Sequence, residues 1–396
     1  MHVEDEVTRS IFSHVRFLAS NIGPRGTGTG GESKAAEYVS ECLDKLGITS
    51  ECFTCRTIIS MNHYTLIIDA MGLLSIILYP LDGGLLRWIA ALLALLVAPF
   101  MALTIRTSVN PLRLFLPKVT SPSVLGKVEP TGQVKHQVVL LSHIDTNKCR
   151  LTWKPERLSA LEPLTYVTLL VQAFLGVLFL YGALVGQRWG IWLVSLLPGA
   201  YLLAMSITLI LDDRTSYSPG ANDNASSVGV VLDLARELTQ QPLTCTRVWL
   251  AFTGAEETDH FGLRSILASR PQEMRQMLFI DLEGVGSGDL IYVTRHGIGL
   301  HYFPDPHLQR LAEGVSRSNL GWMVQGQKMT MSEEVSTLTH LGFRAICIAG
   351  RDPLTHGLTK WHQPDDTFDN LNPRALLRAR DFTRALLAAI DQEISI

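Results

Sequence analysis

Four long apolar blocks, arranged as two closely spaced pairs, constrain the fold of this 396-residue chain more than any other feature. The first pair covers residues 64–80 and 85–105, and the second covers residues 163–186 and 190–211. A helix needs about 20 apolar residues to cross the hydrocarbon core of a bilayer. Three blocks reach this length, whereas the first is shorter and contains Asp69. Such pairs, joined by short turns, predict two transmembrane helical hairpins; buried core helices are the alternative.

Each predicted hairpin begins and ends on the same side of the membrane, so all remaining residues share one compartment. The basic residues at the two short turns are only Arg87 and Arg188. The opposite flanks are richer in basic residues, namely Arg56, Arg106, Arg113, Lys118, Lys148, Arg150, Lys154, Arg157 and Arg214. The positive-inside rule therefore predicts a multi-pass protein of the cell membrane with four transmembrane helices and its remaining residues in the cytoplasm. Asp69 is either a functional acid within the membrane or a residue paired inside the helix bundle.

Outside these blocks, short β-prone runs alternate with helical patterns. The β-prone runs are residues 138–142, 247–252, 277–282 and 344–349. The helical patterns are residues 225–238, 260–268, 306–316, 333–341 and 373–390. This alternation predicts an α/β sandwich around a mixed, largely parallel sheet. The expected domain is discontinuous, with residues 1–60, 108–159 and 212–396 interrupted by hairpins at 61–107 and 160–211.

The N-terminal region predicts an amphipathic helix that carries Ile11, Val15 and Leu18. The glycine-rich residues 23–31 lack the Gly-Lys-Ser/Thr ending of a phosphate-binding loop, so a flexible turn before a helix at 32–46 is expected. The net charge of −3 provides no basic face for nucleic acid, and nucleic-acid binding is therefore not expected.

Polar residues that suit metal chemistry follow the apolar runs, where an α/β sheet presents its ligand-binding groups. The stretch Gly220–Ser227 predicts a tight turn that delivers Asp223, with Asn224 as the N-cap of the next helix. The other members are His143 and Asp145, the pair Glu256 and Glu257, Asp281 and Glu283, and His362 and Asp366.

Imidazole and carboxylate groups are the usual ligands of a catalytic zinc ion. Three carboxylates, Asp223, Glu257 and Glu283, together with one hydroxide balance the charge of two Zn²⁺ ions. Without cations the carboxylates would repel one another strongly. The sequence therefore predicts a two-metal centre. In the Glu256-Glu257 pair, one residue would bind metal while the other accepts a proton from water as the general base.

Five motifs together resemble the co-catalytic zinc aminopeptidases, metallopeptidase family twenty-eight, including its membrane-bound members. They are His143-x-Asp145, Gly-Ala-x-Asp-Asn-Ala-Ser around Asp223, Glu256-Glu257, Asp281-Leu282-Glu283, and His362-x-x-x-Asp366. The resemblance implies a zinc-exopeptidase fold and cleavage of peptides by a metal-bridged hydroxide. It implies that His143, Asp223 and Glu283 hold one zinc ion and that Asp223, Glu257 and His362 hold the other.

The same resemblance makes Glu256 the general base and places Asp145 and Asp366 where they support the centre. Asp145 is accordingly counted with Glu256 in the catalytic set. The family commonly has aspartate where this chain has Glu283, so Asp281, on the same face of its strand, is an alternative ligand. The family's usual glycine after the acidic pair is also missing, since Thr258 and Asp259 follow Glu257.

Several alternatives stay open at the level of sequence. A zinc carboxypeptidase or dipeptidase has a similar ligand order, and a non-catalytic membrane receptor or scaffold could reuse the fold. The stretch Ser332-Glu333-Glu334 resembles the family's serine-acid stretch ahead of a helix and is expected to cap that helix. The remaining histidines of the C-terminal half, His260, His296, His301, His340 and His356, lack ligand spacing and are expected at the surface or in supporting positions. The expected partners are a peptide substrate and the lipid bilayer, whereas the oligomeric state cannot be read from the sequence.

Overall fold

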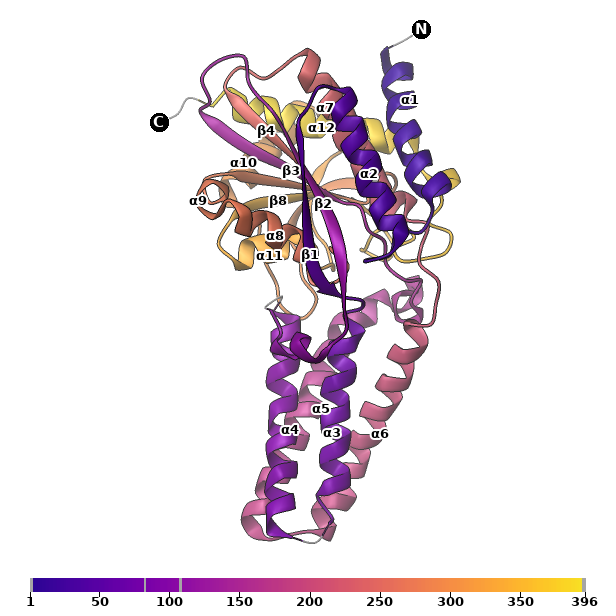
Figure 1. Cartoon of the computed structure of the whole chain (residues 1–396), viewed down its shortest axis with the longest axis vertical. Coiled ribbons are helices and arrows are strands. Elements are labelled where there is room, and N and C mark those ends of the chain that lie inside the picture. The colour runs from indigo at the N-terminus through magenta and orange to yellow at the C-terminus, as the bar shows by residue number, and fades with distance from the viewer. Residues whose placement is uncertain (1–2, 82, 107–108, 394–396) are drawn as a thin grey trace.

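The computed structural model describes residues 3–81, 83–106 and 109–393. It consists of an α/β domain and a bundle of four long helices that projects from it (Figure 1). Both described chain ends lie in the α/β domain, and the chain leaves this domain twice to form the bundle. The predicted hairpin boundary at residues 107 and 108 lies outside the described residues.

An eight-stranded sheet forms the centre of the α/β domain, with the strand order β1-β2-β4-β3-β5-β8-β6-β7. The strands are β1 Ser50–Ile58, β2 Lys118–Val128, β3 His136–His143, β4 Thr246–Thr253, β5 Leu278–Glu283, β6 Asp289–Arg295, β7 Gln325–Lys328 and β8 Arg344–Arg351. The central neighbours β4, β3, β5 and β8 run parallel. The pairs β1–β2, β2–β4 and β6–β8 are antiparallel. The predicted α/β fold with a mixed sheet is confirmed.

Helices cover both faces of the sheet because residues of each buried strand alternate between two cores. Val138 and Leu140 of β3 pack with α1 Val3–Arg16, α2 Gly30–Lys45, α7 Ser227–Gln240, α10 Pro306–Ser318 and α12 Pro373–Asp391. Val139 and Leu141 face the opposite side and pack with α8 Phe261–Ser269, α9 Pro271–Met274 and α11 Glu334–His340. The four predicted β-prone runs lie in β3, β4, β5 and β8, which are the strands buried on both faces.

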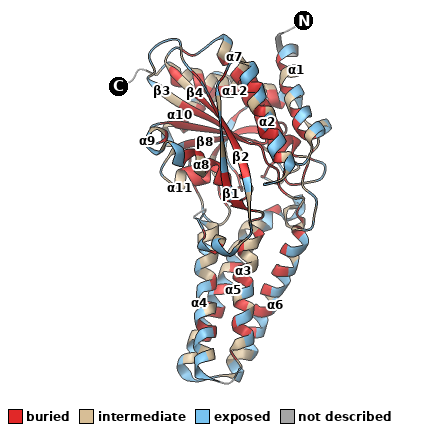
Figure 2. Ribbon diagram, viewed as in Figure 1, coloured by how far each residue is buried: buried red, intermediate tan, exposed pale blue. Residues whose placement is uncertain are grey.

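The apolar blocks form α3 Asn62–Leu78, α4 Gly84–Ile105, α5 Leu158–Val185 and α6 Trp189–Asp212. Among the described residues, three of these helices, α4, α5 and α6, are long and apolar enough to cross a membrane, and α3 is a shorter apolar helix. The buried residues of the bundle include glycines and alanines as well as Tyr79 and Phe179, whereas large apolar side chains such as Leu170 and Leu197 are exposed. Figure 2 shows exposed residues along the outside of the bundle helices. Asp69 is buried inside the bundle, where its carboxylate accepts hydrogen bonds from Gln172 and Ser206.

Candidate metal centre

The polar residues predicted from the sequence meet at one edge of the sheet. His143 ends β3, Glu283 ends β5, and Glu256 and Glu257 follow β4. Because these strands are parallel neighbours, their carboxyl ends lie side by side. Two further segments complete the site: the loop after β8 carries His362, and the turn between α6 and α7 carries Asp223.

Asp223 joins two clusters of metal-binding groups, because each of its carboxylate oxygens faces a different histidine. Its Oδ1 lies 3.2 Å from His143 Nε2, and its Oδ2 lies 3.3 Å from His362 Nε2. On the first side, Glu283 Oε2 is 3.4 Å from His143 Nε2. On the second side, Glu257 Oε1 is 3.1 Å from His362 Nε2. Ligand atoms of His143, Asp223 and Glu257 all lie within 4.8 Å of one another.

This arrangement fits a metal centre. Burial alone would lower the pKa of His362, but the carboxylates of Glu257 and Asp223 raise it to about 9. Burial likewise opposes protonation of His143, yet Glu283 and Glu256 raise its pKa well above the usual value. The carboxylates thus impose an excess of negative charge on both imidazoles, which bound cations would neutralise. One oxygen of Glu283 has no hydrogen-bond partner, as expected of a group available to a metal.

Asp281 is not among the residues that line the pocket, whereas Glu283 is. Neither of its carboxylate oxygens has a hydrogen-bond partner, and the residue is fully buried. Burial, reinforced by Glu283 and Glu334, raises its pKa well above the usual value. The structure therefore brings Glu283, and not Asp281, into contact with His143.

Asp145 and Asp366 hold the backbone of the ligand segments. The carboxylate of Asp366 accepts hydrogen bonds from the backbone N–H groups of Asn222, at 2.6 Å, and Asp223, at 3.1 Å. The carboxylate of Asp145 accepts hydrogen bonds from the backbone N–H groups of Glu256 and Glu257, at 3.1 and 3.3 Å. These contacts fix the direction in which each acidic side chain leaves the backbone.

The backbone carbonyl of Asp145 also orients the first histidine. It lies 3.1 Å from His143 Nδ1, which donates in the tautomer that leaves Nε2 free to face Asp223 and Glu283. Asn147 has a similar effect on the second cluster, because its Nδ2 donates to Glu257 Oε2 at 2.6 Å. Glu257 Oε1 is thereby left facing His362.

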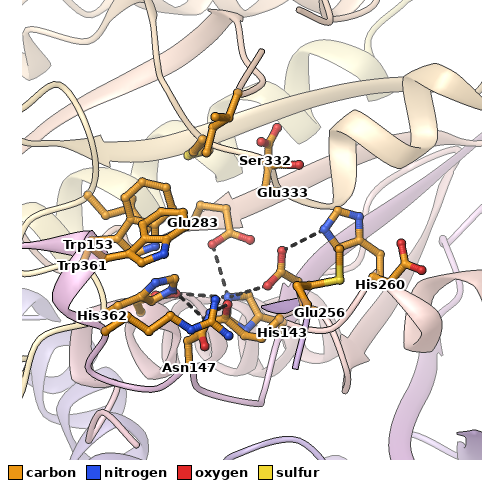
Figure 3. Close-up of a pocket in the computed structure, with 18 of the residues that line it drawn as sticks. His143, Asn147, Trp153, Glu256, His260, Glu283, Ser332, Glu333, Trp361 and His362 are labelled. Atoms are coloured by element: carbon orange, nitrogen blue, oxygen red, sulfur yellow. Dashed lines mark hydrogen bonds and ion pairs between the residues drawn. The ribbon is translucent and has the colours of Figure 1, made fainter. Parts of the chain in front are cut away.

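Glu256 lies between the metal-binding groups and a histidine that the sequence did not single out (Figure 3). Its Oε1 is 3.3 Å from His260 Nε2, and its Oε2 is 4.0 Å from His143 Nε2. The other ring nitrogen of His260 contacts the hydroxyl of Thr337 at 2.7 Å. Burial, reinforced by Arg264, lowers the pKa of His260 to about 3, so its ring is neutral. His260 thus lies beside Glu256 Oε1, while Glu256 Oε2 is the oxygen nearer to His143.

Aromatic side chains form one wall of the pocket. Trp153 and Trp361 pack edge to face with ring centroids 4.4 Å apart, and Trp153 lies 4.7 Å from the ring of His362 (Figure 3). Ser332 and Glu333 line another part of the cavity, which has a volume of about 170 Å³. A small substrate group would therefore contact both apolar rings and the polar centre.

Three expectations from the sequence are wrong. The glycine-rich segment is anchored rather than loose, because the buried Arg25 donates to the carbonyls of Leu18, Gly23, Ile144, Pro219 and Gly220. Asn224 does not cap a helix, since it donates to the carbonyl of Leu282 and accepts from the N–H of Gly284.

The third concerns the acidic pair before α11. Neither Glu333 nor Glu334 caps this helix through its side chain. Glu333 lies 2.6 Å from His296, and Glu334 accepts a hydrogen bond from Thr253. Strands far apart in sequence supply these partners, so local patterns could not reveal them.

Solved structures of similar fold include aminopeptidases and glutaminyl cyclases. A zinc aminopeptidase from Bacillus subtilis, BSAP, matches with a TM-score of 0.56 at 14% identity, covering 96% of this chain and 94% of that chain. A leucine aminopeptidase precursor from Bacteroides thetaiotaomicron matches with a TM-score of 0.56 at 12% identity, covering 98% and 97%. A glutaminyl cyclase of the same organism matches with a TM-score of 0.56 at 13% identity, covering 98% of each chain. The fold is thus that of the zinc exopeptidases.

The sequence comparisons agree with the motifs. Residues 211–387 match Peptidase family M28, so the family indicated by the motifs is confirmed over this segment. Aminopeptidase YwaD of Bacillus subtilis (strain 168) is 27% identical over 190 residues, which cover 46% of this chain and 40% of the relative. The chain therefore spans less than half of that curated relative. The chain is thus similar in sequence to peptidases of this family and similar in fold to zinc aminopeptidases.

Proposed function

We propose that the chain is a membrane-anchored zinc aminopeptidase with two zinc ions at the centre described above. The observation that carries this proposal is the position of Asp223, whose two oxygens face the two histidines separately. A carboxylate that bridges two ions needs this geometry, whereas one ion would need only one of the two clusters. His143, Asp223 and Glu283 would hold the first ion, and Asp223, Glu257 and His362 the second.

Bound zinc ions in this position would polarise the scissile carbonyl and lower the pKa of an attacking water molecule. The chain supplies the proton acceptor, because Glu256 lines the same cavity and its Oε2 lies 4.0 Å from His143 Nε2, farther than Glu283 Oε2 at 3.4 Å. Glu256 would take a proton from water and return it to the leaving amine. Asp145 would hold both Glu256 and Glu257 at their positions through the backbone.

The helix bundle supports a membrane anchor. Glycines lie where helices approach closely: a Cβ on Gly176 would lie 3.0 Å from the carbonyl oxygen of Ala94. Small residues at helix contacts and large apolar residues outside are typical of membrane bundles, where packing rather than water exclusion drives association. We place the hairpins at residues 61–107 and 160–211, which gives four membrane spans. The basic flanks favour the orientation in which the α/β domain is cytoplasmic.

Metal analysis combined with product sequencing tests the catalytic proposal. We expect purified, zinc-loaded protein to bind two zinc ions and to release single residues from the amino end of a peptide library. Glu256→Gln should retain zinc and lose at least about a hundredfold in kcat, which is the lower range for loss of a general base. Glu313→Gln, on the exposed side of α10, is the matched control.

The same experiment separates the alternatives. Release from the carboxyl end would identify a carboxypeptidase, and cleavage limited to dipeptides would identify a dipeptidase. Unchanged kcat in Glu256→Gln would refute the role of this residue. Absence of any cleavage with two zinc ions bound would favour a receptor or scaffold.

A further inference from the structure

A second cavity lies between the helix bundle and the metal centre. It has a volume of about 240 Å³ and is bordered by the domain-proximal ends of all four bundle helices, including Thr65 of α3, Met101 of α4, Leu164 of α5 and Met205 of α6. We call it the bundle cavity. Its walls are mainly apolar side chains, so its occupant should be apolar over most of its surface.

The bundle cavity adjoins the catalytic pocket. Both are lined by the same five residues, Met61, Thr104, Arg150, Trp153 and Ile298. Trp153 also packs against His362 of the metal centre. A molecule in the bundle cavity would therefore lie next to the catalytic pocket.

Arg150, at this junction, favours a peptide as the occupant. The residue is 5% exposed, and its Nη2 donates to Ser60 Oγ at 3.1 Å. Its Nε has no hydrogen-bond partner, although a buried N–H group without a partner is costly. The nearest carboxylate is that of Asp213, 4.0 Å from Nη2. A peptide carbonyl would satisfy the free N–H, whereas a lipid offers acceptors only in its ester and phosphate groups and none along its hydrocarbon tail.

The order of the two cavities indicates which part of the peptide each would contain. An aminopeptidase leaves one residue on the amino side of the scissile bond, and the catalytic pocket of about 170 Å³ is the smaller space. The chain on the other side of the bond continues for several residues. The bundle cavity, at about 240 Å³ and with walls from four helices, suits that side.

We infer that the bundle cavity binds apolar side chains on the carboxyl side of the scissile bond, while Arg150 donates to a peptide carbonyl. This inference rests on the proposed peptidase function and adds a substrate class to it, namely peptides with apolar residues after the first. Such peptides arise when membrane-spanning segments are cleaved. The helices beside the α/β domain would thus select the substrate as well as anchor the enzyme.

The test fills the bundle cavity without touching the metal centre. In the full chain in lipid nanodiscs, Met205→Trp would occupy the cavity, and Leu203→Trp, outward-facing on the same helix, is the matched control. Two peptides share their first residue, and one has leucine and phenylalanine where the other has glycine and serine. We expect Met205→Trp to raise KM for the apolar peptide by at least about tenfold, the range for misfit in an apolar pocket. For the polar peptide, the KM of Met205→Trp should stay within about twofold of the wild-type KM.

Equal effects on both peptides, or no effect on either, would overturn the inference. If Met205→Trp changed the amount of co-purified lipid and left both KM values unchanged, lipid would be the occupant of the bundle cavity and the inference would be overturned. Binding provides a readout independent of cleavage: Glu256→Gln protein should bind a fluorescent apolar peptide, and adding Met205→Trp should weaken this binding by about tenfold. If wild-type protein cleaves nothing but this difference appears, the peptidase proposal fails and the binding cavity stands. Equal binding by both proteins would exclude the cavity.

Discussion

Replacing Asp366 by asparagine tests whether the backbone around Asp223 is held in place by a charged acceptor. The two oxygens of Asp366 accept the N–H groups of Asn222 and Asp223 at 2.6 and 3.1 Å, and the residue is almost fully buried. Asparagine keeps one oxygen but places an N–H₂ group against the second backbone donor. One hydrogen bond to a charged group is lost, which costs about 1.5–3 kcal/mol.

A comparable loss is expected in metal affinity. Residues that support metal ligands typically change affinity by about 10–100-fold. This range corresponds to about 1.4–2.8 kcal/mol and agrees with the loss of one charge-assisted hydrogen bond. We therefore expect Asp366→Asn to weaken zinc binding by about 10–100-fold while the protein remains folded.

Competition with a fluorescent chelator measures the zinc affinity, and circular dichroism with thermal unfolding measures the fold. Asp365→Asn is the matched control, because Asp365 is adjacent, exposed and paired with Lys360 at the surface. Zinc affinity within twofold of the wild type in folded Asp366→Asn protein would refute the reasoning. An equal loss in Asp365→Asn would do so too, since a general charge effect would then explain it.

Two further predictions concern His260 and His14. His260→Asn shortens the side chain while tolerating the left-handed backbone at φ 55°, so Glu256 loses the contact at its Oε1. We expect kcat to fall by about tenfold or more with KM and zinc content unchanged, and a change confined to KM would contradict this role. Burial, the largest cause, lowers the pKa of His14 to about 4, so the unfolded chain binds the proton more readily between the ordinary value of 6.5 and 4. The free energy of unfolding should therefore fall as pH decreases through this window. Urea titrations from pH 7 to 4 should show a shallower fall for His14→Gln than for the wild type. Equal dependence of the free energy of unfolding on pH in the two proteins would contradict this prediction.

The sequence by itself determined the elements whose signals are local. The buried parallel strands are continuous apolar runs, and the bundle helices are long apolar blocks, so both follow from composition and length. Strands β1, β2, β6 and β7 lie toward the edges of the sheet, and their mixed burial left no comparable run. The five proposed ligands and Glu256 could be selected because each follows a strand or turn in a spaced motif.

Only the tertiary structure decided how these groups meet and what surrounds them. Arg25 and His260 gave no usable signal in the sequence, because their partners are backbone carbonyls or side chains from distant segments. The choice of Glu283 over Asp281 depended on which of two residues on the same strand face reaches His143. The bundle cavity needed the packing of four helices against the domain, and no single helix contains it. The periodicity of apolar residues along a chain indicates which residues are buried. A contact between two distant segments, in contrast, exists only after the chain has folded.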